Sequence, residues 1–141
     1  MNPVNPLDIT DSVSPLNSFD PEVGVSVDTR YIQEQSQPNE GRFLFTYNIT
    51  ISNDSDIPLT LVKRYWLITN SDDSKIEVNG DGVVGDQPLI GPGQSYQYTS
   101  GVVLNSQVGT MQGHYVMEKS NGETFNATIP AFLLCVPNAI N

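Results

Sequence analysis

Hydrophobic and polar residues alternate along much of the chain, which is the pattern of half-buried β-strands. Every second residue from Val23 to Tyr31 is apolar or β-branched, and we expect this strand to run on to Gln35. After a turn with proline and glycine at residues 37–41, the alternation returns in residues 43–51. The short connection and the shared period of two predict that the two segments pair as an antiparallel hairpin.

The rest of the chain continues as short strands separated by turns rich in Gly, Pro, Asn and Asp. Residues 59–69 are apolar on both faces at their centre, as expected of a central strand, and Trp66 suits a core position there. No segment has the 3.6-residue period of an amphipathic helix. We therefore predict an all-β fold, a two-sheet antiparallel β-sandwich of seven or eight strands. The further strands are expected at residues 75–78, 95–104, 108–118 and 124–136.

Length and composition indicate one soluble domain. The chain has 141 residues, one cysteine and no apolar run near the ~20 residues of a membrane-spanning helix. Residues 1–21 are rich in proline and short polar side chains, so we predict a flexible N-terminal tail followed by a domain at residues 22–141. The start of the chain lacks the basic and apolar regions of a secretory signal, and a cytoplasmic location is expected.

The formal net charge of −10 limits the partners of the protein. It opposes binding to nucleic acid and to anionic membrane surfaces, because both depend on many Lys and Arg side chains. A small anion could still be held locally by backbone N–H groups or by a pair of basic side chains. Exposed edge strands would also allow a sheet-extended homodimer.

Gly80, Gly82 and Gly85 match the pattern G-x-G-x-x-G, which binds pyrophosphate in dinucleotide-binding folds. The helix that this chemistry needs is missing, since a loop and another strand follow Gly85. Two interpretations stay open: a structural loop that uses positive φ angles, and a nest of N–H groups that binds pyrophosphate or a nucleotide.

Lys63 and Arg64 stand beside Tyr65 and Trp66 in the predicted central strand. Arg64 and Trp66 share a face, so they are either a binding groove for a phosphate-bearing or peptide ligand, or the edge and centre of the core.

Other reactive side chains give weaker signals. We predict no catalytic residues, no metal site and no cofactor. His114 and Cys135 are the sole histidine and thiol, but Cys135 lies in an apolar run where it is expected to be buried.

The spacing of four aspartates near the glycines fits no calcium-loop pattern, and they are interpreted as turn residues. A metal-dependent phosphohydrolase would need these side chains to cluster: Asp72, Asp73, Asp81 and Asp86.

Several linked motifs closely resemble, in matching order, those of the bacterial ApaG family. They are residues 64–69, 80–88, 92–93, 98–101, 109–115 and 129–132, within a likeness that covers about residues 23–137. The resemblance implies a fibronectin type III-like or immunoglobulin-like sandwich. It also implies an association with cobalt and magnesium tolerance, protein-interaction roles in related domains, and no established enzymatic activity. Bacterial members commonly have histidine where this chain has Tyr65.

Two functions follow as expectations. The first is a non-enzymatic protein-interaction module, indirectly linked to divalent-cation homeostasis. The second is a small-molecule binder of pyrophosphate or a nucleotide. Its candidate residues are Gly80, Gly82, Gly85, Arg64 and Trp66.

Overall fold

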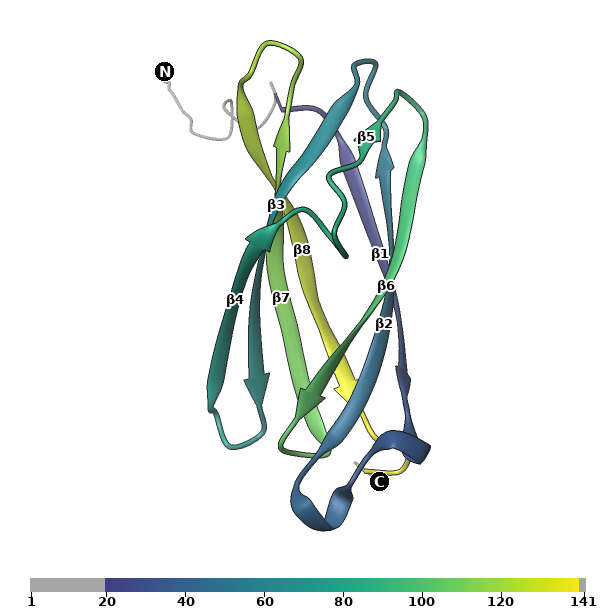
Figure 1. Cartoon of the computed structure of the whole chain (residues 1–141), viewed down its shortest axis with the longest axis vertical. Coiled ribbons are helices and arrows are strands. Elements are labelled where there is room, and N and C mark those ends of the chain that lie inside the picture. Colours follow the sequence, from purple (N-terminus) through teal and green to yellow (C-terminus); the bar gives the residue numbers. More distant parts are fainter. Residues whose placement is uncertain (1–19, 140–141) are drawn as a thin grey trace, which may run out of the picture.

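The structure is a computed structural model that describes residues 20–139, and within them it is a sandwich of two antiparallel sheets (Figure 1). One sheet has the strand order β1-β2-β6, and the other has the order β4-β3-β7-β8 with the short β5 paired to β3. The predicted all-β sandwich is confirmed. The strands are β1 (Val23–Tyr31), β2 (Phe43–Asn53), β3 (Leu59–Asn70), β4 (Lys75–Asp81), β5 (Leu89–Ile90), β6 (Ser95–Leu104), β7 (Val108–Glu118) and β8 (Thr124–Cys135).

The predicted hairpin of β1 and β2 is confirmed, with Val25 opposite Ile51. Alternate residues of β2 face the core, and all of the inward ones are buried. The first strand is shorter than predicted, because it ends at Tyr31 and two 3-10 turns follow at Gln33–Gln35 and Pro38–Glu40. The Ser36 hydroxyl replaces regular strand pairing there, because it donates to the Ile32 carbonyl at 2.7 Å and accepts from the Leu44 N–H at 2.9 Å. The predicted tail lies outside the described residues, except for Asp20 and Pro21.

A β-bulge in β3 changes which residues face the core. Leu61 and Trp66 are both buried, although strict alternation would put them on opposite faces. The pairing with β7 shifts between Leu61 and Lys63, so that Val62 is an extra residue. Beyond the bulge the even-numbered residues face inward. Trp66 is 2% exposed at the centre of the core, as the sequence predicted.

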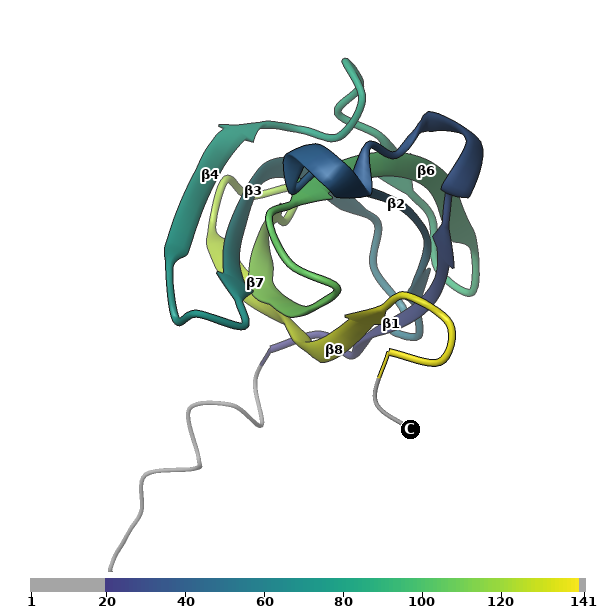
Figure 2. The same ribbon diagram turned by 90° about the horizontal axis from the view of Figure 1, so that it is seen from below.

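The two sheets meet differently at their two sides. On one side the outer strands β1 and β8 lie next to each other (Figure 2). On the other side β4 and β6 are the outer strands, and residues 82–88 lead from β4 across to β5. We call residues 82–88 the crossover loop. Bonds from Gly82 N–H to Val62 and from Leu61 N–H to Pro88 hold it against β3.

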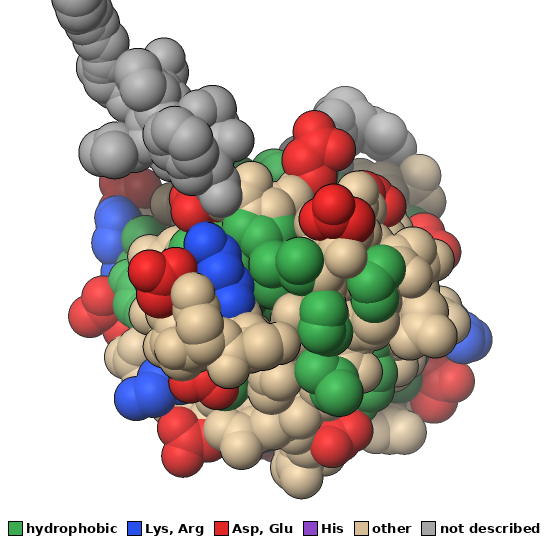
Figure 3. Space-filling model, turned by 90° about the horizontal axis from the view of Figure 1, so that it is seen from above, with side chains coloured by type: hydrophobic (Ala, Val, Ile, Leu, Met, Phe, Trp, Pro, Cys, Tyr) green, Lys and Arg blue, Asp and Glu red, His purple; other side chains and the backbone are tan. Residues whose placement is uncertain are grey.

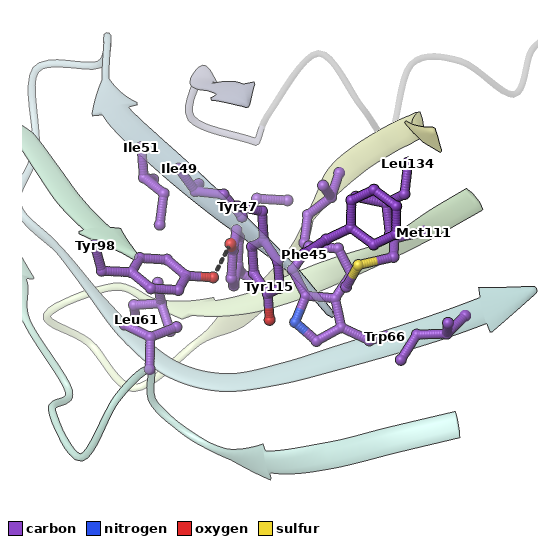
Figure 4. Packing of buried hydrophobic residues seen from close by; sticks show 14 of the residues in the cluster. Phe45, Tyr47, Ile49, Ile51, Leu61, Trp66, Tyr98, Met111, Tyr115 and Leu134 are labelled. Carbon is purple, nitrogen blue, oxygen red and sulfur yellow. Dashed lines mark hydrogen bonds between the residues drawn. The ribbon is translucent and has the colours of Figure 1, made fainter. Parts of the chain in front are cut away.

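The buried side chains of both sheets form one core (Figure 4). Tyr98 of β6 and Tyr115 of β7 join the sheets through a hydrogen bond of 2.5 Å between their hydroxyl groups, which Figure 4 marks with a dashed line. Burial raises the pKa of both phenols far above the ordinary tyrosine value of about 10. Within residues 20–139, none of the helices is long and apolar enough to cross a membrane.

Candidate functional site

The three glycines predicted as one loop have three different positions. Gly80 lies inside β4, which extends beyond the predicted strand at residues 75–78 and runs to Asp81. Gly82 begins the crossover loop with a φ of 58°. Val84 and Gly85 are the two central residues of a tight turn between Val83 and Asp86, with φ angles of 42° and 79°. Positive φ at both central residues is the geometry of a type I′ turn.

Backbone N–H groups of this loop donate to the protein itself. Gly82 donates to the Val62 carbonyl at 2.9 Å, and Val83 and Asp86 donate to each other's carbonyls at 2.8 and 2.9 Å. A phosphate-binding nest needs successive N–H groups that converge on a ligand. These three donors hold the loop in its conformation.

Arg64 connects β3 to the same loop. Its Nη1 donates to the carbonyls of Asp81 and Gly82, at 3.1 and 2.9 Å. The guanidinium lies across Gly80, where an added Cβ would come within 2.6 Å of Nη1. Gly80 therefore leaves the space that the arginine side chain fills.

The far end of the loop is held by β6. Tyr96 donates its hydroxyl hydrogen to Asp86 Oδ2 at 3.1 Å. Burial and this hydrogen bond raise the pKa of Tyr96 above its ordinary value. Because Arg64 holds one end and Tyr96 the other, the crossover loop links the two sheets at their open side.

Arg64 and Trp66 come together as the sequence suggested, at a cavity between the sheets. This inter-sheet pocket has a volume of about 260 Å³ and is lined from β2, β3, β4, β6 and β7. Trp66 packs edge-on against Tyr47, Phe132 and Tyr115, with ring centroids 5.4, 5.8 and 6.4 Å apart. The side chains that line the pocket besides Arg64 and Trp66 are Tyr47, Ile68, Val78, Ser100, Val102 and Met111.

The outer face of the five-stranded sheet carries an aromatic pair that we did not single out from the sequence. Tyr65 of β3 is directly opposite His114 of β7, and their rings stack at 5.2 Å with an interplanar angle of 25°. Tyr65 also donates its hydroxyl hydrogen to Glu77 at 2.6 Å, and this bond raises the pKa of Tyr65. The pair borders a depression of about 270 Å³. We call it the outer-face depression, lined by Lys63, Arg64, Tyr65, Asn79, Gly80, Asp81, His114 and Val116.

One end of the sandwich also exposes apolar side chains. Figure 3 shows hydrophobic groups gathered near the middle of this end, with acidic groups around them. The short strand β5 lies at this end, and its Leu89 is 69% exposed. Exposed apolar area of this kind is common at protein contact surfaces.

The four aspartates do not form the cluster that a metal-dependent hydrolase would need. Asp72 accepts a bond from the Ser74 N–H in the β3–β4 turn, and hydrogen bonds from Ser74 lower its pKa. Asp81 lies at the opposite end of β4, roughly 20 Å away at 3.3 Å per strand residue. Asp86 binds Tyr96. Among residues 20–139, no three His, Cys, Asp or Glu side chains are placed to hold one metal ion.

His114 and Cys135 do not form a nucleophile–base pair. Cys135 is opposite Val108 in β7, six residues from His114 along that strand. This spacing corresponds to roughly 20 Å. Cys135 is partly buried, and its thiol lies 3.3 Å from the Val136 carbonyl as a donor.

Comparison with known proteins gives consistent matches. A family model described as the ApaG domain matches residues 33–119. Protein ApaG of a Pseudomonas aeruginosa strain is 51% identical over 120 residues, covering 85% of this chain and 95% of that protein. Protein ApaG of an Escherichia coli strain is 50% identical over 121 residues, covering 86% and 97%.

Solved structures agree with the sequence matches. A crystal structure described as the putative ApaA protein from Bordetella pertussis has a TM-score of 0.81 at 41% identity. The match covers 84% of this chain and 96% of that one. A protein from Archaeoglobus fulgidus is similar in fold, with a TM-score of 0.53 at 8% identity.

Proposed function

This chain belongs to the ApaG domain family, and from that premise we propose that it is a non-enzymatic protein-binding module. We assign the binding surface to the outer-face depression with its stacked pair, Tyr65 and His114. The link to cobalt and magnesium homeostasis is indirect in this proposal and runs through the bound partner.

The Tyr65–His114 stack is the observation that carries the proposal. Both residues lie on central strands, so the backbone pairing of three strands fixes their positions. Both side chains are half-buried, and their rings stack on each other. Aromatic side chains that are held rigidly lose little entropy on binding and are enriched at interface hot spots. Lys63 and Asp81 also line the depression, and charges at a binding surface influence orientation and specificity.

The pyrophosphate alternative has less support. Three N–H groups of the crossover loop donate to backbone carbonyls, and Arg64 Nη1 donates to two more carbonyls. An anion would have to displace these bonds or use the remaining donors. Calorimetric titration with pyrophosphate separates the two functions, because only the alternative requires saturable binding at this loop.

A growth experiment tests the link to cation tolerance. We expect the chain to restore cobalt tolerance in a bacterial strain whose own ApaG-domain gene has been deleted. The double variant Tyr65→Ala/His114→Ala should fail to do so, because it lacks the stacked pair while keeping the core intact. The matched control is the double variant Gln97→Ala/Val103→Ala, which removes two exposed side chains from the outer face of the other sheet. This control should restore growth.

Both variants must be expressed at the wild-type level and have similar melting temperatures. Full tolerance with the Tyr65→Ala/His114→Ala chain would contradict the assignment of the partner surface to the outer-face depression.

A further inference from the structure

The inter-sheet pocket contains buried polar groups without protein partners. Tyr47 is 6% exposed and Trp66 is 2% exposed. Within residues 20–139, neither the Tyr47 hydroxyl nor the Trp66 indole N–H forms a hydrogen bond with another protein group. In Figure 4 the phenol oxygen of Tyr47 and the indole nitrogen of Trp66 lie close to each other in the view, and no dashed line reaches either atom. A buried donor left unsatisfied is destabilising, and a bound water, ion or ligand that pairs with it relieves that cost.

Arg64 adds a positive charge at the same pocket. Its Nη1 binds the crossover loop, whereas its Nε and Nη2 groups have no acceptor among the described residues. No carboxylate in residues 20–139 forms an ion pair with this half-buried guanidinium. Burial raises the pKa of Tyr98 and Tyr115, and the Arg64 charge opposes that rise. Arg64 is therefore electrostatically close to the buried phenols.

These groups define the chemistry of a ligand. Arginine and the indole N–H can only donate hydrogen bonds, so the ligand must present acceptors. The uncompensated positive charge favours an anion. The apolar side chains Ile68, Val78, Val102 and Met111 favour a hydrocarbon group beside the acceptors.

Size and polarity narrow the choice further. The volume of about 260 Å³ is below the roughly 300–1,000 Å³ typical of drug-sized ligands, so it favours a ligand smaller than a nucleotide. A free phosphate or pyrophosphate would face apolar walls that cannot hydrogen-bond to its remaining oxygens. A carboxylate accepts two parallel bonds from one guanidinium and carries its own apolar tail.

We propose that the inter-sheet pocket binds a small aliphatic monocarboxylate. Its carboxylate accepts hydrogen bonds from Arg64, Trp66 and Tyr47, and its hydrocarbon chain lies against the apolar lining. The site is on the inner face of β3, whereas the outer-face depression involves Tyr65 on the other side of the strand. Arg64 lines both sites, but Tyr47 and Trp66 are buried and line the inter-sheet pocket alone, so the proposal does not rest on the protein-binding function.

Nuclear magnetic resonance of the full chain tests this site, because Trp66 is the sole tryptophan and gives one indole N–H signal. Sodium butyrate is the probe, at constant ionic strength. We expect the indole signal to shift saturably at millimolar butyrate. Butyramide, its neutral isostere, should bind at least tenfold more weakly. Arg64→Gln should weaken butyrate binding at least tenfold, and Tyr47→Phe should weaken it severalfold.

Lys63→Gln is the matched control, since it removes the neighbouring positive charge from the outer face of the same strand. It should leave butyrate affinity unchanged. Tyr47→Phe keeps the test decisive if Arg64→Gln fails to fold, because it removes a single oxygen. An indole signal that does not move would overturn the proposal. So would equal shifts with butyramide, or equal losses of affinity in the Lys63 and Arg64 variants.

Discussion

Replacement of Gly82 by alanine is expected to lower the free energy of unfolding by about 2–5 kcal/mol. Gly82 has a φ of 58°, a conformation that costs other residues roughly 1–2 kcal/mol. An added Cβ would also lie 2.0 Å from the Asp86 carbonyl oxygen, which is backbone and cannot rotate away. Relieving an overpacked contact of this kind costs about 1–3 kcal/mol more. Val83 would be displaced with the loop, and it is fully buried.

Gly85→Ala is the matched control for Gly82→Ala. Gly85 also has a positive φ, of 79°, but no atom lies within 4 Å of the position that an added Cβ would take. Only the conformational cost of about 1–2 kcal/mol is expected there. Urea unfolding of the two variants measures both values. Equal destabilisation within about 0.5 kcal/mol, the usual deviation from additivity, would show that the Asp86 contact does not constrain the loop.

Alkaline pH should unfold the domain through Tyr98 and Tyr115. Below the ordinary tyrosine pKa of about 10 both states keep these protons, and stability does not depend on them. Above it the unfolded chain loses both protons, whereas burial keeps the native phenols protonated. The native state then binds more protons, so stability falls as pH rises. The pair contributes a slope of about 2.7 kcal/mol per pH unit, twice the value for one group.

Phenylalanine variants isolate this pair from the other tyrosines. Tyr98→Phe or Tyr115→Phe alone leaves one buried hydroxyl unpaired and should cost about 1–3 kcal/mol at pH 7. The double variant removes both partners and should be nearly neutral at pH 7. Above pH 10 the free energy of unfolding of the double variant should fall less steeply with pH, because the contribution of the two phenols is absent. Urea unfolding at several pH values measures this slope. An unchanged slope in the double variant would mean that these phenols ionise in the native state.

The alternating pattern is sufficient to predict the sandwich, the β1–β2 hairpin and the core position of Trp66. Such features depend on which residues a strand must bury, and a period of two reports that directly. A proline inside a strand is expected at a bulge, bend or edge. Pro130 lies in the outer strand β8, within the irregular pairing between Met111 and Gly113 of β7. Proline suits that place because it lacks the N–H that regular pairing requires.

Other features depend on contacts between distant residues. The β3 bulge at Val62 has no marker in the local sequence, and it changes the face of every residue after it. The glycine pattern groups Gly80 with the loop, although its role is to make room for Arg64 on the neighbouring strand. The stack of Tyr65 on His114 requires the β3–β7 register, which joins positions 49 residues apart. Sequence periodicity does not contain that register.

The central claim is that the outer-face depression binds a protein partner, and quantitative affinity capture tests it most directly. Three chains would be immobilised on a support at equal density: the wild type, the Tyr65→Ala/His114→Ala variant and the Gln97→Ala/Val103→Ala control. Each would then be incubated with the same bacterial cytosolic extract. We predict that at least one protein is retained by the wild type and the control, and at least tenfold less by the Tyr65/His114 variant, as expected for loss of a hot spot of about 2 kcal/mol. Equal recovery on all three chains would contradict the claim.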